Sequence, residues 1–145
     1  MRQILHLEID LVGMERVVPL ENSPAGDAWV CLSPVGDTVA LIAEADASTI
    51  RFWDLQTGKT VGQPIVSGAG FYTSNAHIGG FSPDGRHFVA GANDGRVTVC
   101  DVATGRQTLQ LGPMRESRFK FVGYSPDGSR IGTAQAALGD VQLLD

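Results

Sequence analysis

Short stretches of alternating apolar and polar residues recur along this 145-residue chain and predict β-strands. Three of the clearest end in aspartate and span residues 50–54, 97–101 and 141–145. In the first of them Ile50 and Phe52 point to one side of the expected strand and Arg51 to the other. The 18 glycines and 7 prolines are spread along the chain, which favours many short strands over a few long helices. The pattern therefore predicts an all-β fold.

The turn-forming residues of the chain contain a repeat. Ser-Pro turns begin at Ser33, Ser82 and Ser125, and their prolines are 49 and 43 residues apart. The aspartates that end the three strands are 47 and 44 residues apart. A Thr-Gly pair follows each of the first two strands, at Thr57 and Thr104. Three marks in one order and at nearly one spacing predict three copies of one structural unit.

The residues that mark the repeat each have a physical role in a turn or a strand end. Proline fixes φ at the second position of a turn, and Asp-Gly supplies a side-chain hydrogen bond and a positive φ. The sequence Asn93-Asp94-Gly95 lies between two apolar stretches and predicts a tight hairpin. The residues expected to form the frame of the repeat are Trp53, Asp54, Pro83, Asp84, Gly85, Asp94, Gly95, Asp101, Pro126, Asp127 and Gly128.

The order of these marks resembles a known repeat. Phe-Ser-Pro-Asp-Gly at 81–85, a strand, Asp94-Gly95, a second strand, Trp53-Asp54 and a following Thr-Gly are similar to the WD40 repeat, and the match covers residues 28–145. The resemblance implies a partial β-propeller of about three four-stranded antiparallel blades. Their approximate bounds are residues 28–66, 77–112 and 118–145.

The resemblance also suggests a role for the first 27 residues. Residues 2–7 echo residues 106–111, which are the expected fourth strand of the second repeat. We therefore expect residues 1–27 to form a strand followed by a loop, with the strand serving as the fourth strand of a preceding or closing blade. The chain would then begin with a fourth strand and end after a third.

The repeats depart from the polar network that WD40 blades often carry. The Gly-His pair before the first strand is missing from all three repeats. The tryptophan position is occupied by Trp53, Cys100 and Leu144. The aspartate of the turn between the second and third strands is Ala47, Asp94 and Leu138. We therefore expect apolar packing, rather than this network, to hold the repeats together.

Charge and cysteine content bear on the partners and the cellular location that the sequence predicts. The net charge is −5 and the 11 basic residues are scattered, which argues against a nucleic-acid partner. Cys31 and Cys100 lie in apolar, strand-like stretches, so buried free thiols and a cytoplasmic location are expected. Glu8 and Asp10 interrupt the apolar run at the N-terminus, and the sequence predicts neither an export signal nor a membrane span.

The chain offers few candidates for catalysis. His6, His77 and His87 share no metal-ligand spacing, and most aspartates are explained by turns. The three Ser-Pro serines do not lie in Gly-x-Ser-x-Gly elbows, and the glycine-rich residues 68–70 lack a P-loop lysine. We expect no catalytic residues, no cofactor and no metal.

Protein binding has better candidates, which lie in loops. In WD40 propellers one face is made by the loops after the fourth and second strands, and the first of these correspond to residues 14–27, 67–76 and 112–117. They and their flanks contain aromatic, Met and Arg side chains of the kind enriched at protein interfaces. The candidate protein-binding residues are Phe71, Tyr72, Asn75, Met114, Arg115 and Arg118. The alternative for Phe71 and Tyr72 is that they pack over the edge of a blade.

Propellers usually need four to eight blades, so about three blades leave several interpretations. The chain is a piece of a larger propeller, or a homo-oligomer in which the fourth strand of one chain completes the last blade of another, or an open array. We favour the first. The predicted function is a non-enzymatic scaffold that binds other proteins or further blades of the same protein. The alternatives are a propeller that belongs to or assists an enzyme, such as a hydrolase, a peptidase or a kinase-linked bacterial signalling protein, and an inert piece without a partner.

Overall fold

The computed structural model describes residues 6–11, 14–43, 45–71, 79–114, 119–135 and 141–145. These residues form short strands and, within the described ranges, no helix, which confirms the predicted all-β fold for this part of the chain. The strands are β1 (His6–Leu11), β2 (Met14–Pro19), β3 (Ala28–Leu32), β4 (Thr38–Ala43), β5 (Asp46–Asp54), β6 (Thr60–Val66), β7 (Gly79–Phe81), β8 (His87–Gly91), β9 (Val97–Asp101), β10 (Gln107–Leu111), β11 (Phe119–Tyr124), β12 (Ile131–Gln135) and β13 (Val141–Leu144).

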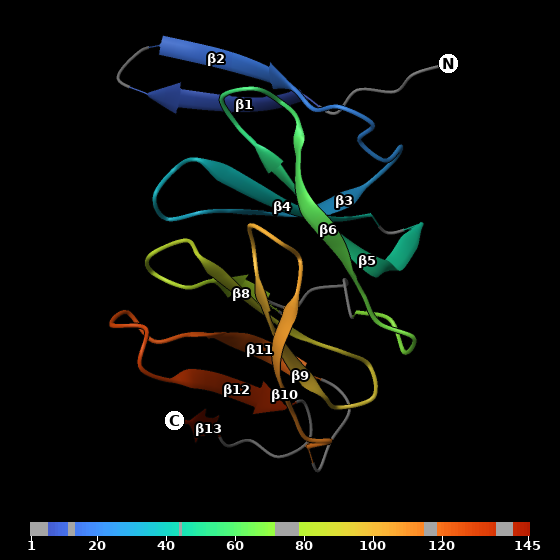
Figure 1. Cartoon of the computed structure of the whole chain (residues 1–145), viewed down its shortest axis with the longest axis vertical. Coiled ribbons are helices and arrows are strands. Elements are labelled where there is room, and N and C mark those ends of the chain that lie inside the picture. Colours follow the sequence, from blue (N-terminus) through green and yellow to red (C-terminus); the bar gives the residue numbers. More distant parts are fainter. Residues whose placement is uncertain (1–5, 12–13, 44, 72–78, 115–118, 136–140) are drawn as a thin grey trace.

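The strands form a two-stranded hairpin and three larger antiparallel sheets. The hairpin is β1–β2, the first sheet has the order β3-β4-β5-β6, the second β10-β9-β8-β7 and the third β11-β12-β13. Figure 1 shows these four units following one another along the long axis of the molecule, with the β1–β2 hairpin at one end and the third sheet at the other. Each larger sheet is built from strands consecutive in the sequence, as expected for a repeated unit.

The N-terminal region differs from the sequence-based expectation. Residues 14–19 were expected in a loop, but they form β2, which pairs with β1 from Leu11↔Met14 to His6↔Pro19. The strand expected at 2–7 falls mostly outside the described residues, and β1 begins at His6. The reason for the difference is that Val17 and Val18 favour a strand, and Val18 is anchored in a buried cluster.

Alternate residues of the first sheet face opposite neighbours, because side chains alternate across a strand. Val39, Leu41 and Trp53 are buried in one cluster with Val18 and Leu20, and this cluster joins the first sheet to the segment that begins with β2. The indole Nε1 of Trp53 donates a hydrogen bond of 2.7 Å to the backbone oxygen of Glu21. The polar atom of this buried ring is therefore paired with the chain that follows the hairpin.

The opposite face of the first sheet packs on the second sheet through aromatic rings. The ring of Phe52 contacts those of Phe81 and Phe88 edge to face, with centroids 5.9 and 5.4 Å apart. Trp29 meets Phe88 in the same manner at 6.3 Å. The buried cluster continues through the second sheet to Phe119 of the third. Each of the first two sheets thus buries side chains on both faces.

The Ser-Pro turns join the first and second strands of each larger sheet. In the second sheet the amide of Gly85 donates to the oxygen of Ser82 at 2.9 Å, and Ser82 Oγ donates to Asp84 at 2.6 Å. The third sheet repeats both bonds, from Gly128 to Ser125 and from Ser125 Oγ to Asp127. Pro83 and Pro126 occupy the second positions of these turns. The turns are therefore closed by the residues that the sequence pattern singled out.

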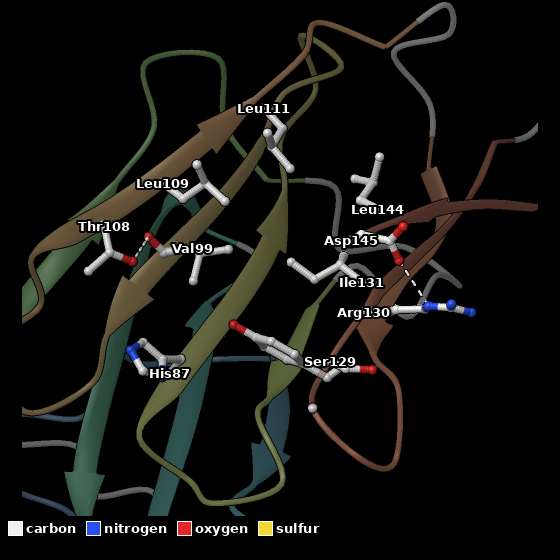
Figure 2. A pocket seen from close by; sticks show the side chains of 12 residues that line it. His87, Val99, Thr108, Leu109, Leu111, Ser129, Arg130, Ile131, Leu144 and Asp145 are labelled. Atoms are coloured by element: carbon white, nitrogen blue, oxygen red, sulfur yellow. Dashed lines mark hydrogen bonds and ion pairs between the residues drawn. The ribbon is translucent and has the colours of Figure 1, made fainter.

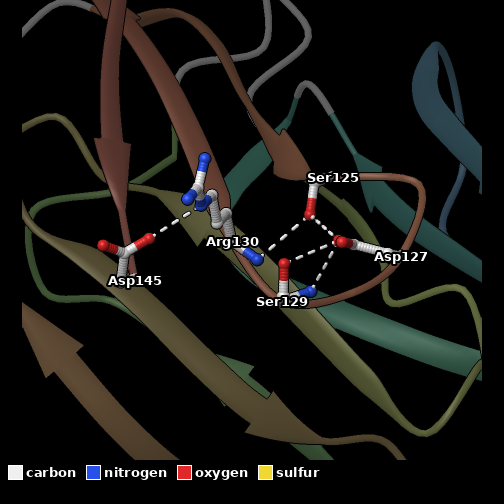
Figure 3. A network of polar contacts seen from close by, with 5 residues as sticks. All are labelled: Ser125, Asp127, Ser129, Arg130 and Asp145. Carbon is white, nitrogen blue, oxygen red and sulfur yellow. Dashed lines mark hydrogen bonds and ion pairs between the residues drawn. The ribbon is translucent and has the colours of Figure 1, made fainter.

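The aspartate of the third turn accepts several hydrogen bonds (Figure 3). Besides Ser125 Oγ, the backbone amide and the hydroxyl of Ser129 donate to Asp127 at 3.0 and 2.7 Å. These donors stabilise the carboxylate and hold the pKa of Asp127 well below its usual range, with Ser125 as the largest cause. The pKa of Asp84 is also lowered, first by the hydrogen bond from the Ser82 hydroxyl and then by that from the backbone amide of Arg86.

The first sheet lacks this acceptor because Val35 stands where the other turns have aspartate. Ser33 Oγ is buried and has no hydrogen-bond partner. An unpaired buried hydroxyl costs stability, since folding removes it from water without replacing that hydrogen bond. The turn still closes through its backbone, from the Gly36 amide to the Ser33 oxygen at 2.9 Å.

A second set of turns joins the third and fourth strands of the first two sheets. Asp54 accepts hydrogen bonds from the amides of Gln56 and Thr57, and Asp101 accepts one from the amide of Thr104. The aspartate that ends each third strand therefore caps the turn that follows it, which accounts for its recurrence in the sequence.

Glycine is required in these turns because another part of the backbone approaches closely. Gly58 and Gly105 have φ values of +71° and +72°. A Cβ at Gly58 would collide with the oxygen of Pro19, and one at Gly105 with the oxygen of Gln63. Each glycine thus lets the preceding unit of the stack contact the turn through its main chain.

We expect Trp53 to be a principal source of stability. Trp53→Phe keeps an aromatic ring but removes the hydrogen bond to Glu21, and should lower the free energy of unfolding by about 1–2 kcal/mol. Trp53→Ala also removes the packing and should lower it by about 3–5 kcal/mol. Urea denaturation followed by circular dichroism measures both, with Trp29→Phe as a control of smaller effect. An unchanged midpoint for Trp53→Ala would contradict the core position.

We also expect that one substitution in the first Ser-Pro turn can make the protein more stable. Val35→Asp would give Ser33 Oγ the acceptor present in the other two turns and should raise the free energy of unfolding by about 0.5–1.5 kcal/mol. The same substitution in a Ser33→Ala background should bring no gain, because the hydroxyl is gone. Equal effects in the two backgrounds would show that the unpaired hydroxyl is not the cause. Urea denaturation is again the measurement.

Candidate interaction site

Two of the three segments that the sequence analysis assigned to binding, which begin at residues 67 and 112, meet where β6 and β10 end. Residues 67–71 follow β6, and their backbone is tied down by hydrogen bonds to neighbouring strands. The amide of Phe71 donates to the oxygen of Ala47 at 2.6 Å, and the amide of Asn93 donates to the oxygen of Gly70 at 2.9 Å. The side chain of Asn93 donates to Ala69 at 3.3 Å. This segment is therefore held against both the first and the second sheet.

The turn at residues 93–95 lies between these two segments. It closes the hairpin of β8 and β9 through the amide of Gly95, which donates to the oxygen of Ala92 at 3.0 Å. Asp94 accepts from the backbone amide of Arg96 at 3.1 Å and pairs with its guanidinium at 3.2 Å. Both side chains stay largely exposed, so the ion pair presents two charges to solvent.

The segment that follows β10 docks on the same turn from its other side. The amide of Met114 donates to the oxygen of Gly95 at 2.8 Å. Backbone hydrogen bonds thus join residues 67–71, 93–95 and 112–114 into one connected surface, which we call the loop face. The side chains of Asn93 and Asp94 add hydrogen bonds to these main-chain bonds.

A polar pocket of about 330 Å³ opens on the loop face. It lies between the segment that begins at Ile65 and the outer strands of the second sheet. Its polar lining includes Asp94, Arg96, Thr98, Gln107 and Gln110. These side chains offer both donors and acceptors, which suits hydrogen bonding to a polar segment of another molecule.

The structure buries one of the predicted binding residues and partly buries another. Phe71 is 2% exposed and belongs to the core cluster, and Met114 is half-buried against it. The packing alternative therefore describes Phe71, and neither side chain is freely presented to a partner. Tyr72, Asn75, Arg115 and Arg118 lie outside the described residues.

Sequence reasoning missed Arg96, Gln107 and Gln110 as lining residues. The only signal for Arg96 was its position next to the Asn-Asp-Gly hairpin. The two glutamines come from β10, whose alternation gives no hint of the neighbouring loop. Their proximity depends on how residues 67–71 fold back, which no local pattern encodes.

An apolar groove of about 320 Å³ lies apart from the loop face, between β10 and the third sheet (Figure 2). Leu109, Leu111, Ile131 and Leu144 contribute its apolar side chains, and Arg130 and Asp145 form an ion pair of 2.9 Å at its rim. Tyr124 also lines it. Burial, with smaller effects of nearby Asp84 and Cys100, raises the pKa of the Tyr124 hydroxyl to about 12, so this hydroxyl stays protonated at neutral pH.

The two cysteine thiols of the described residues are poorly suited to nucleophilic chemistry. Cys31 and Cys100 are free thiols, and burial raises both pKa values, that of Cys100 to about 11. A protonated thiol is a poor nucleophile. Within the described ranges no three His, Cys, Asp or Glu residues are grouped to hold a metal ion. Among these residues there is also no helix long and apolar enough to cross a membrane.

No protein-family model matches this sequence, and no curated protein matches it.

We expect the Asp94 side chain to stabilise the central turn mainly through the backbone of Arg96. Asp94→Ala removes this hydrogen bond and should lower the free energy of unfolding by about 1 kcal/mol. Asp94→Asn keeps an acceptor and removes only the exposed ion pair, which contributes little, so its stability should stay close to that of the wild type. Urea denaturation separates the two. Equal losses in both variants would mean that the ion pair dominates.

Proposed function

We propose that this chain is a non-enzymatic scaffold for protein–protein interaction, built of WD40-type repeats in which the three sheets are successive blades of a β-propeller. The repeated order of turns supports this architecture, because each turn has the same hydrogen bonds in at least two sheets. The stacking of consecutive sheets through their faces agrees with it.

The observation that carries the proposed function is the loop face. Three loop segments are joined there by backbone hydrogen bonds, and a polar pocket opens beside two of them. A surface that is already ordered loses little conformational entropy when a partner binds, which favours recognition. The partner we propose is a protein that presents a polar segment to Arg96 and the neighbouring glutamines.

The roles of the ionisable side chains support binding rather than catalysis. Asp54, Asp84, Asp101 and Asp127 all accept hydrogen bonds within turns, so their carboxylates serve the frame. A cytoplasmic location is part of the proposal, since the two cysteines remain free thiols.

Site-specific photo-crosslinking in cells tests the proposed function. A photoreactive phenylalanine at Ala69, which is exposed on the loop face, should form adducts with a different protein. The same group at Lys59, which is exposed in a turn at the other end of the strands, is the control and should form none. Arg96→Ala should lower the yield at position 69 by on the order of tenfold. Failure of position 69 to form adducts, or equal yields at both positions, would overturn the proposal.

A further inference from the structure

The third sheet has an open edge where the other two sheets carry a fourth strand. In the first and second sheets the third strands, β5 and β9, each pair with a fourth, β6 and β10. Among the described residues, the corresponding strand β13 pairs only with β12. Its outer edge therefore presents backbone donors and acceptors that could pair with another strand.

The same sheet also exposes apolar side chains at positions that are buried in its neighbours. Val141 and Leu143 are 66% and 60% exposed, whereas their counterparts Val97 and Val99 in the second sheet are 0% and 7% exposed. Phe121 on β11 is 42% exposed. An apolar face of this kind marks a surface that another layer of protein covers.

The groove in Figure 2 is a further difference between the third sheet and the other two. At the junction of the first and second sheets, the turn at Thr104 and Gly105 fills the space beside Gln63. At the next junction the corresponding space is the groove between Leu109 of β10 and Leu144 of β13. The edge and the face could both accept a strand with the geometry of β6 and β10, and the groove lies where the turn at Thr104 and Gly105 has its counterpart.

The hairpin at the opposite end of the stack carries a strand with that geometry. The end of β2 contacts the turn at Gly58 through the oxygen of Pro19, as β6 contacts the turn at Gly105 through the oxygen of Gln63. The amide of Glu21 also donates to the oxygen of Gly58 at 2.7 Å. Relative to the first sheet, β2 therefore occupies the position of a fourth strand.

The partner of β2 in the hairpin has the register of a third strand. Ile9 pairs with Arg16, just as Trp53 pairs with Thr60 in the first sheet. The sequence Ile9-Asp10 in β1 corresponds to Trp53-Asp54, and Leu144-Asp145 at the end of β13 has the same pattern. Because β1 and β13 end in the same pattern, either strand could pair with β2 in the same register.

We infer that two copies of this chain associate by exchanging this pairing: β13 of one copy replaces β1 beside β2 of the other. The third sheet of each copy then gains a fourth strand and covers the Trp53 face of its partner's first sheet. The exchange is reciprocal and closes with two-fold symmetry, so it leaves no open third sheet. The occupant is a second copy because the described residues hold both complementary halves, a strand in the fourth position and a sheet whose outer edge is open.

The exchange loses some backbone pairing, because β2 gives up the six residue pairs that it makes with β1 for pairs with the four-residue strand β13. The pairing that β2 makes with β1 is lost, and pairing with β13 takes its place. The gain is the burial of Phe121, Val141 and Leu143, which are exposed in the single chain. Removal of apolar surface from water then drives the association.

The inference rests on the proposed repeat architecture, and the mass of the chain in solution tests it first. Light scattering on a sizing column should give the mass of two chains for the wild type. Leu143→Asp should raise the dissociation constant by about tenfold or more, because it places a charge in the apolar contact. Val66→Asp is the matched control, since Val66 is exposed on β6 outside the contact, and it should leave the constant unchanged. A wild-type mass of one chain at micromolar concentration would overturn the inference.

Disulfide trapping tests the strand exchange itself. Phe52 pairs with Val61 in the first sheet, and the equivalent residues of the exchanged pair are Leu143 and Val17. We would mix Val17→Cys protein with Leu143→Cys protein, both in a Cys31→Ala background, under oxidised glutathione. A disulfide-linked pair of chains is expected, because directly opposed residues in a sheet have suitable Cβ separations.

The control mixture replaces Leu143→Cys by Gln142→Cys, whose side chain points to the other face of β13 and should not link. Equal linking of positions 142 and 143, or none at 143, would overturn the exchange. Circular dichroism melting shows whether each variant folds. The photo-crosslinks at Ala69 report on the loop face alone, so a chain that fails to exchange strands but still labels partners retains the proposed function.

Discussion

Stacking of consecutive sheets through apolar side chains is the constraint on which the rest of the structure depends. A four-stranded sheet that buries only one face leaves the other in water, and here the first two sheets avoid this by packing against a neighbour on each side. Trp53 is the clearest example. Its ring is fully buried between two layers, and its Nε1–H therefore donates a hydrogen bond to the oxygen of Glu21. The exposed face of the third sheet is the place where the constraint is unmet within one chain.

Polar chemistry in this molecule is concentrated in its turns. The Ser-Pro turns and the turns capped by Asp54 and Asp101 place charged or hydroxyl groups where they hold the chain in a tight reversal. Carboxylates used in this way have lowered pKa values, as at Asp127, because their donors favour the ionised form. These turns lie at the ends of the strands opposite the loop face, which is held by the backbone hydrogen bonds among residues 67–71, 93–95 and 112–114.

The sequence alone allowed prediction of the strands and turns but not of the contacts between distant segments. Ser-Pro-Asp-Gly and Asn-Asp-Gly identify turns because proline, aspartate and glycine act within a few residues of themselves. β2 was missed because its role depends on a backbone contact with Gly58, far along the chain. Phe71 was placed on a binding surface for the same kind of reason, since aromatic residues suit interfaces and cores equally well. Only the bridge from Phe71 to Ala92 and its burial assign it to the core.

The close approach of main chain to main chain at Gly58 and Gly105 has a consequence for how such a protein diverges. The spacing between successive layers is fixed there by peptide groups, which are the same whatever side chains surround them. Interior positions can then drift, and Trp53, Cys100 and Leu144 at one equivalent position show how far. A side chain at either glycine would collide with the main chain of the neighbouring layer, whereas a substitution at those interior positions acts through the side chains packed around it. The two glycines therefore set how closely the main chains of neighbouring layers approach, alongside the apolar packing between the sheets.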